Sequence, residues 1–256
     1  MMRVLVTNDD GIHAPGLAAL EEIALQITED VWVCAPSENQ TGASHSLTLS
    51  MPVRLRKHGE RRFSVTGTPT DAVSLALKKV IKSPPDLILS GINAGANLGD
   101  DVSYSGTVSA AMEGALAGIK SIALSQFMRP ERPKWGDRYS AARSWGPKIV
   151  DSLISTQFAS RTLINVNFPC LDAKSVKGIR VTRQGLHNYN RSKVHQAHDP
   201  HGKPYYWFGL DPISKAPDHG TDIEAIMESY VAITPLQLDL THYDSMPGLA
   251  QLLQDL

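Results

Sequence analysis

Hydrophobic positions in the first two thirds of the chain change repeatedly between two patterns. Short, continuous apolar runs, typical of strands buried on both faces, occupy residues 3–7, 31–35, 87–90, 121–124 and 163–167. Helices are expected between them, over residues 17–27, 72–81, 104–118 and 139–156. Strand–helix–strand units of this kind build a parallel sheet with helices on both faces. The pattern therefore predicts an α/β fold with a doubly wound, mainly parallel sheet.

Three further features are expected in this first part of the chain. Residues 47–55 and 62–66 are predicted strands that could pair as a hairpin. Thr70 or Asp71 is expected to cap the helix that follows. Residues 126–138 hold two prolines and are expected to form a surface excursion.

Beyond residue 170 the pattern changes. Strands are predicted at residues 178–183, 205–208 and 229–234, and a short helix at 247–256. Residues 187–220 are polar and hold five of the nine histidines, which indicates an extended hairpin arm rather than core. Exposed aromatic residues on such an arm usually mark a subunit contact, so we expect an oligomer. We divide the chain into a core, residues 1–170, and a C-terminal extension, residues 171–256.

Composition narrows the functional classes. The chain has 25 Lys and Arg against 26 Asp and Glu, so no overall charge favours a nucleic acid or a membrane. Cys34 and Cys170 form neither a disulfide framework nor a metal-type spacing, and Cys34 is expected to be a buried thiol. The N-terminus has no signal-peptide pattern, and no apolar run approaches the ~20 residues of a membrane span. We expect a cytoplasmic protein.

The first strand ends in two adjacent carboxylates, Asp9 and Asp10, followed by a glycine. Side by side, two acids repel each other unless a cation lies between them or one of them holds a proton. Ligands of open α/β sheets bind at the carboxyl ends of the strands, where this pair lies. The simpler interpretation, a solvated turn or a helix cap, would suffice for the pair taken alone.

Two more polar loops, residues 37–46 and 90–107, also follow predicted parallel strands, so the three loops should converge if these strands are neighbours. Asp9 and Asp10 would supply the hard oxygen ligands that Mg²⁺ or Mn²⁺ prefers. Ser105, Gly106 and Thr107 begin a predicted helix and offer N–H groups and hydroxyls to an anion. A divalent metal beside an anion site is typical of phosphoryl-group hydrolysis. Alternatively, Ser105 and Thr107 only cap the helix.

Several motifs follow one another along nearly the whole chain. They are Val6-Thr-Asn-Asp-Asp-Gly, Thr41-Gly-Ala-Ser-His-Ser, Gly67-Thr-Pro-Thr-Asp, Ser90-Gly-Ile-Asn-Ala-Gly-Ala-Asn-Leu-Gly, Tyr104-Ser-Gly-Thr-Val, Asn165-Val-Asn-Phe-Pro, Thr182-Arg-Gln-Gly, Thr221-Asp222 and Ile233-Thr-Pro-Leu. Together they resemble the survival protein SurE family. The resemblance implies a cytoplasmic, divalent-metal-dependent phosphatase of nucleoside 5′- and 3′-monophosphates. It also implies a Rossmann-like core and a C-terminal extension that exchanges between the subunits of a dimer or tetramer.

The resemblance also implies a set of site residues. The metal ligands fall on Asp9, Asp10, Thr41 and Asn93. Thr41 departs from the family's serine, although it keeps the hydroxyl, and Gln40 stands where the family often has a basic residue.

The same motifs suggest a mechanism. Asn97, Ser105, Gly106 and Thr107 would hold the phosphoryl oxygens. Asp9 and Asp10 are the catalytic pair, with Asp9 as the base for a water that attacks phosphorus; a covalent aspartyl-phosphate is the competing route.

Two other classes remain as alternatives. A nucleotide-binding sensor would keep the anion site without turnover, whereas a dinucleotide enzyme is disfavoured because no Gly-x-Gly-x-x-Gly follows the first strand. The preferred base, 5′ against 3′ specificity, exopolyphosphate cleavage, Mg²⁺ against Mn²⁺, and dimer against tetramer stay open.

Overall fold

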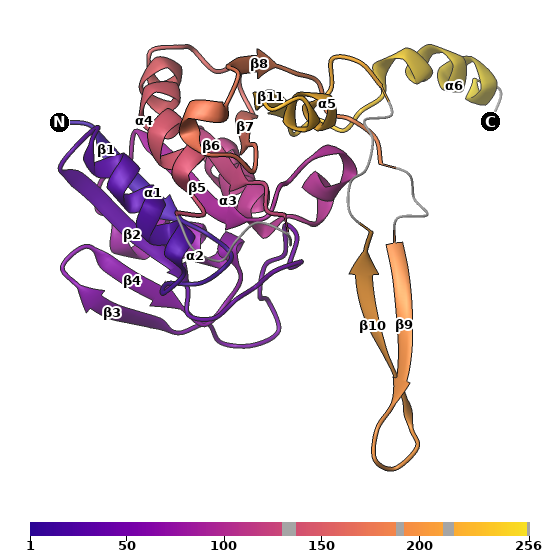
Figure 1. Cartoon of the computed structure of the whole chain (residues 1–256), viewed down its shortest axis with the longest axis horizontal. Helices are drawn as coiled ribbons and strands as arrows, with labels where there is room; N and C mark the ends of the chain where they lie inside the picture. Colours follow the sequence, from indigo (N-terminus) through magenta and orange to yellow (C-terminus); the bar gives the residue numbers. More distant parts are fainter. Residues whose placement is uncertain (130–136, 188–191, 212–217, 255–256) are drawn as a thin grey trace.

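A mostly parallel sheet forms the body of the protein (Figure 1). The computed structural model describes residues 1–129, 137–187, 192–211 and 218–254. Within these residues nine strands form one sheet in the order β3-β4-β2-β1-β5-β6-β7-β11-β8. Their bounds are β1 (Arg3–Thr7), β2 (Asp30–Pro36), β3 (Leu55–Gly59), β4 (Arg62–Val65), β5 (Leu87–Ala94), β6 (Lys120–Gln126), β7 (Thr162–Phe168), β8 (Ile179–Val181) and β11 (Val231–Gln237).

The central six strands, from β4 to β7, run parallel, which confirms the predicted doubly wound sheet. From β1 the chain passes outward to β2 and β4, and then returns to β5 on the other side of β1. Such a reversal of strand order is the position where open α/β sheets bind ligands.

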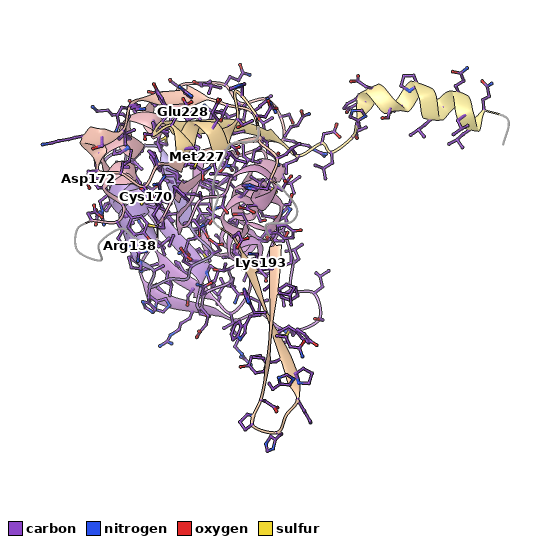
Figure 2. The ribbon with its side chains drawn as sticks, turned by 45° about the vertical axis from the view of Figure 1, so that its right-hand side comes forward. Arg138, Cys170, Asp172, Lys193, Met227 and Glu228 are labelled. Atoms are coloured by element: carbon purple, nitrogen blue, oxygen red, sulfur yellow. The ribbon has the colours of Figure 1, made fainter. Side chains whose placement is uncertain are left out.

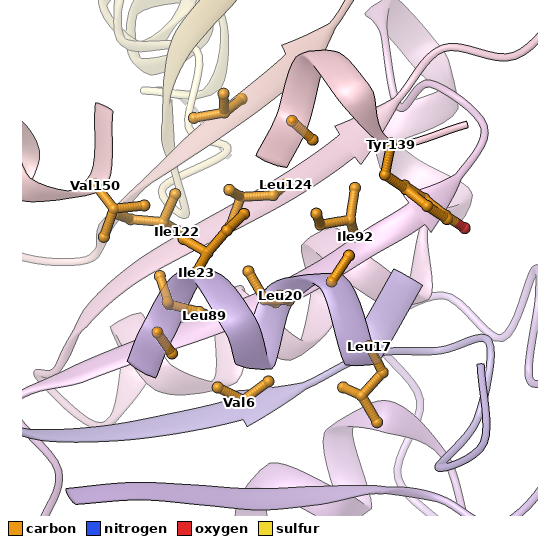
Figure 3. Close-up of a cluster of buried hydrophobic side chains, with 14 of the residues drawn as sticks. Val6, Leu17, Leu20, Ile23, Leu89, Ile92, Ile122, Leu124, Tyr139 and Val150 are labelled. Carbon is orange, nitrogen blue, oxygen red and sulfur yellow. The ribbon is translucent and has the colours of Figure 1, made fainter. Parts of the chain in front are cut away.

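Helices cover both faces of the sheet. Successive residues of the central strands point to opposite faces, and the residues on both faces are apolar. Val4 and Val6 pack with α1 (Pro15–Leu25) and α4 (Ser140–Ile154) in one core cluster, part of which Figure 3 shows. Leu5 points to the opposite face, where α2 (Pro69–Leu75) and α3 (Gly106–Leu116) contact each other.

Some expected elements differ in the structure. Residues 47–54 form no strand, and the hairpin of β3 and β4 begins only at Leu55. Leu49 and Met51 are exposed, so this segment has no apolar face to bury in the sheet. The helix expected over 72–81 ends as α2 at Leu75 and continues as a π-helical turn, η1 (Ala76–Val80). A helix not expected from the sequence, α5 (Asp222–Met227), precedes β11.

The N-cap of α2 is Thr68, which corrects the expectation of Thr70 or Asp71. The Thr68 hydroxyl accepts a hydrogen bond from the Asp71 N–H, and the Asp71 carboxylate accepts one from the Thr68 N–H. The same carboxylate accepts two bonds from Thr48, from its N–H at 3.1 Å and its hydroxyl at 2.5 Å. The Thr68 hydroxyl donates to the carbonyl of Ser46. The capping box of α2 therefore also fixes the end of the polar loop 37–46.

Replacing Asp71 with alanine is expected to lower the free energy of unfolding by about 2 kcal/mol, because the cap is lost and the donors of Thr48 and Thr68 lose their acceptor. Asp151, an exposed carboxylate on α4, provides the matched control, and Asp151→Ala should change stability by less than about 0.5 kcal/mol. Urea unfolding followed by circular dichroism measures both. Equal midpoints for the two variants would contradict the role of Asp71.

The effect of Asp71 should also depend on pH. Burial acts to raise the pKa of Asp71, but the hydrogen bonds from Thr48 and Thr68 outweigh it and leave the pKa lowered. A lowered pKa means that the ionised carboxylate stabilises the fold at neutral pH, and that this contribution disappears as the pH falls through the folded-state pKa. The stability difference between the wild-type protein and Asp71→Ala should therefore shrink in acid.

The C-terminal extension has two parts. β11 pairs antiparallel with β7, and β8 pairs parallel with β11, so both extend the main sheet. β9 (Ser192–His198) and β10 (Pro204–Leu210) form a separate two-stranded hairpin that projects from the body, as does α6 (Met246–Leu253) (Figures 1 and 2). The hairpin confirms the expected arm. The division of the chain at residue 170 stays a prediction, and the excursion expected at 126–138 lies partly outside the described residues.

The arm and α6 expose large apolar side chains. Trp207 and Phe208 on β10 are 67% and 82% exposed, and Leu252 on α6 is 75% exposed. In Figure 2 the hairpin extends away from the body, with side chains projecting to either side of it.

Candidate active site

The three polar loops singled out in the sequence meet at the carboxyl ends of β1, β2 and β5. The Gln40 N–H donates to the Asp9 carbonyl at 2.8 Å, which joins the second loop to the first. The Ala94 N–H donates to the Asp10 carboxylate at 3.2 Å, which joins the third loop to the first. The Ser44 hydroxyl donates to the Ser103 carbonyl at 2.7 Å, which joins the second and third loops. The expected convergence is therefore present.

Asp9 is buried between the end of β1 and the start of α3. Its side chain is hydrogen-bonded by the Thr107 hydroxyl, and a methyl group added at Gly106 would come within 2.7 Å of its Cβ. Burial raises the pKa of Asp9 to about 6; the Thr107 hydrogen bond acts to lower it, and the charge of Asp10 raises it further. Asp9 is thus held rigidly in a position that disfavours its charged form.

Asp10 is less buried than Asp9. Burial still raises the pKa of Asp10, whereas the hydrogen bond from the Ala94 N–H acts to lower it. The hydrogen bonds to the pair come from neutral groups, the Thr107 hydroxyl and the Ala94 N–H. Neither donor brings a positive charge, although the two carboxylates are adjacent. A divalent cation would remove their mutual repulsion, so the donor set suits a hard cation.

Asn93 and Thr41, from the other two loops, are the remaining residues of the predicted ligand set. Asn93 lies where the pairing of β5 with β6 shifts register, an irregularity of the kind that re-aims side chains next to active sites. Its amide N–H donates to the Gly95 carbonyl at 3.0 Å, which leaves the side-chain oxygen as an acceptor. The Thr41 hydroxyl donates to the Asn39 side chain at 2.6 Å and keeps its lone pairs. Both residues can offer a neutral oxygen to a cation.

The predicted phosphate-binding residues have distinct places. Ser105 is the N-cap of α3, since its hydroxyl accepts from the Val108 N–H at 3.1 Å. Gly106 and Thr107 form the first turn of that helix beside Asp9. Asn97 belongs to the loop after β5. Its side chain donates to the hydroxyl of Ser125, near the carboxyl end of β6, at 2.7 Å. The structure thus brings Gly106 and Thr107 to Asp9, whereas Ser105 caps the helix and the side chain of Asn97 is bound to β6.

Buried amides hold Asn97 in place, a role that sequence reasoning did not assign. Asn165 and Asn167 on β7 both donate to the Asn97 carbonyl, at 2.9 and 3.0 Å. The Asn97 N–H donates to the Asn167 side chain at 2.9 Å. The available signal was the alternation Asn165-Val-Asn167, which puts two amides on one face of a strand.

Within the described residues, no helix is long and apolar enough to span a membrane. No cluster of three or more His, Cys, Asp or Glu side chains suited to a metal is present in this part of the chain either. The predicted site has only two such residues and takes its other oxygens from an amide and a hydroxyl.

Comparison with known proteins supports one family. Residues 4–191 match the model of the family described as survival protein SurE. A 5′-nucleotidase SurE of Erythrobacter litoralis is 60% identical over 94% of this chain and 96% of its own length. The 5′-nucleotidase SurE of Rhizorhabdus wittichii is 52% identical over 96% and 97%. The crystal structure of a SurE protein from Aquifex aeolicus, 41% identical, superposes with a TM-score of 0.84 over 98% of this chain and 99% of the other. The chain belongs to the survival protein SurE family.

Proposed function

We infer that this protein is a 5′-nucleotidase, a phosphatase that converts nucleoside monophosphates to nucleosides and phosphate. The observation that carries this inference is the carboxylate pair against the N-terminus of α3, in a chain 60% identical to a relative named 5′-nucleotidase SurE. Cleavage of 3′-monophosphates is part of the same proposal, since the residues proposed for the site would contact the phosphate rather than the sugar.

We propose that Asp9, Asp10, Thr41 and Asn93 hold one divalent cation, Mg²⁺ or Mn²⁺. Two carboxylate oxygens, an amide oxygen and a hydroxyl are the ligands that these hard cations prefer. When bound, such an ion polarises the phosphoryl group, neutralises its charge and makes water a better nucleophile. The neutral donors around the two acids support this assignment, because they leave the negative charge uncompensated.

The first turn of α3 is proposed to bind the phosphoryl oxygens. The N–H groups of Gly106 and Thr107 are among those a helix leaves without an intrahelical acceptor, and the helix dipole favours an anion there. The Ser105 hydroxyl is occupied in capping the helix, so its contribution is to orient these N–H groups. Asn97, held in place by the amides of β7, would be a further contact for the phosphoryl oxygens.

Asp9 is proposed as the base that accepts a proton from the attacking water, with Asp10 as its partner in the catalytic pair. The Thr107 hydroxyl fixes the orientation of the Asp9 carboxylate, and the rigid start of α3 keeps the carboxylate next to the phosphate position. Direct attack by water is favoured over an aspartyl-phosphate because the acids are adjacent rather than alternating on one face of the strand end.

We also propose that the arm and α6 join this chain to further copies of itself, as a dimer or tetramer in the cytoplasm. The exposed Trp207, Phe208 and Leu252 support this assignment.

Removal of divalent metal is expected to abolish phosphate release. The protein is treated with EDTA, dialysed, and assayed with a nucleoside 5′-monophosphate, with and without added Mn²⁺ or Mg²⁺. Activity should fall by roughly 10³-fold or more without the ion and return with it, since the two acids alone would repel a phosphate dianion. A protein that binds the nucleotide but releases no phosphate in the presence of either ion would be a sensor, and the proposed function would be wrong.

A further inference from the structure

Two motifs of the sequence, Thr182-Arg-Gln-Gly and Thr221-Asp222, have no part in the site described above. They lie where the hairpin arm leaves and rejoins the body, and we call residues 182–187 and 218–222 the arm base. The Arg183 N–H donates to the Gly220 carbonyl, and the Asp222 N–H donates to the Arg183 carbonyl, each at 3.0 Å. The two sides of the arm base are therefore bound to each other.

Asp222 is completely buried and joins three segments of backbone. One carboxylate oxygen accepts the Gly99 N–H at 2.9 Å. The other oxygen accepts the N–H groups of Gly185 at 2.9 Å and of Ile223 at 2.8 Å. Gly99 belongs to the glycine-rich loop, residues 95–104, which connects β5 to α3. A single carboxylate thus binds this loop to the arm base.

Other arm-base residues form hydrogen bonds with the same part of the loop. The Gln184 side chain donates to the Gly99 carbonyl at 3.0 Å, so both backbone polar groups of Gly99 are bound by the arm base. The His187 N–H donates to the Asp100 side chain at 2.7 Å.

The two backbones approach each other closely at two glycines, Gly99 and Gly185. Gly99 has a φ of +52°, and a methyl group there would lie 3.1 Å from the Gly185 carbonyl oxygen. A methyl group at Gly185 would lie 3.0 Å from the Asp222 carboxylate.

The glycine-rich loop connects the arm base to the candidate active site. It contains Asn97 and runs directly into Ser105, the cap of α3. One residue beyond the cap, Gly106 packs on Asp9, and Thr107 is hydrogen-bonded to it. A shift of the loop would therefore move the first turn of α3 relative to the carboxylate pair.

We propose that Asp222 is a positioning residue for phosphate binding, which holds the glycine-rich loop and the first turn of α3 in place from the base of the arm. The proposal rests on the proposed function for its kinetic test only. It also gives the arm base a role at the site that is separate from any contact between subunits.

Asp222→Asn is the sharpest test. An asparagine oxygen can still accept from Gly185 and Ile223, but its NH₂ group would then face the Gly99 N–H, so the bond to the loop is the one that is lost. The KM for a nucleoside 5′-monophosphate should rise roughly tenfold, and the inhibition constant of inorganic phosphate should rise by the same factor. Amide hydrogen exchange at residues 98–101 should accelerate, while exchange in β1 and β5 should stay unchanged.

Two further variants keep the test interpretable if Asp222→Asn folds poorly. Gln184 is exposed, so Gln184→Ala should fold normally and raise KM and the phosphate inhibition constant by a smaller, equal factor. Asp218→Asn is the matched control, because Asp218 pairs with Arg183 on the surface of the arm base without touching the loop. It should leave both constants unchanged.

The outcomes separate the two proposals. A purely structural role would lower the amount of active protein, and so kcat, with KM and the phosphate inhibition constant unchanged; that result would overturn the positioning role. If the wild-type protein released no phosphate, the proposed function would fail. The positioning role of Asp222 would still be tested by inorganic phosphate binding in a calorimeter and by hydrogen exchange. Wild-type values of both in Asp222→Asn would refute it.

Discussion

Replacing Asp9 with asparagine is expected to lower the rate of phosphate release by roughly 10³-fold while the protein stays folded. The substitution removes the negative charge proposed to bind the cation and the oxygen proposed to accept the proton of water. Asparagine has nearly the same shape, and its side-chain oxygen can still accept the Thr107 hydroxyl. Because burial raises the pKa of Asp9, loss of the charge removes an electrostatic cost, so thermal stability should be unchanged or higher.

The control is Asp151→Asn, which removes one carboxylate from the exposed face of α4 and should leave activity unchanged. Measured quantities are phosphate release at saturating Mn²⁺, the Mn²⁺ affinity by calorimetry, and the melting temperature. The Mn²⁺ affinity should fall together with the rate. Turnover near that of the wild-type protein would remove Asp9 from the mechanism, and loss of turnover with an unchanged Mn²⁺ affinity would separate its role as a base from its role as a ligand.

The type of sheet and the convergence of the three polar loops could be predicted because both depend on local patterns. The apolar runs around Val6 and Leu89 could bury only in a sheet covered on both faces, and the structure places them there. Polar loops at the ends of parallel strands must meet if the strands are neighbours, as the bonds from Gln40 to Asp9 and from Ala94 to Asp10 show.

Partners distant in sequence could not be predicted, since a single chain gives no signal for which polar groups pair. Asp222 and Gly99 are separated by 123 residues, and Asn167 and Asn97 by 70. The helix cap was misplaced for a different reason, because its signal is local. Thr68 is followed by Pro69 in the first turn and by Asp71 at N3, which is the pattern of a capping box.

Gly106 lies where the backbone of α3 packs closely against Asp9. Alanine in a helix is usually more favourable than glycine, so propensity alone would make Gly106→Ala slightly stabilising. At this position, however, the new methyl group would lie 2.7 Å from the Asp9 Cβ and 3.1 Å from the Pro69 Cγ. The first distance is shorter than real contacts between carbon atoms and the second is tight, so Asp9 or the start of α3 must move.

We expect Gly106→Ala to lower kcat/KM by roughly 10²-fold, because a displacement of a few tenths of an ångström to one ångström is enough to misalign a catalytic group. The N–H of residue 106 is retained, so a loss of activity would report the displacement and not the loss of a phosphate donor. Gly248 on α6 has open space around it, and Gly248→Ala should gain the same helix propensity without affecting activity. If kcat/KM of Gly106→Ala matched that of Gly248→Ala, close packing of α3 on Asp9 would have no part in catalysis. The proposed phosphate position at the first turn of the helix would then lose its main geometric support.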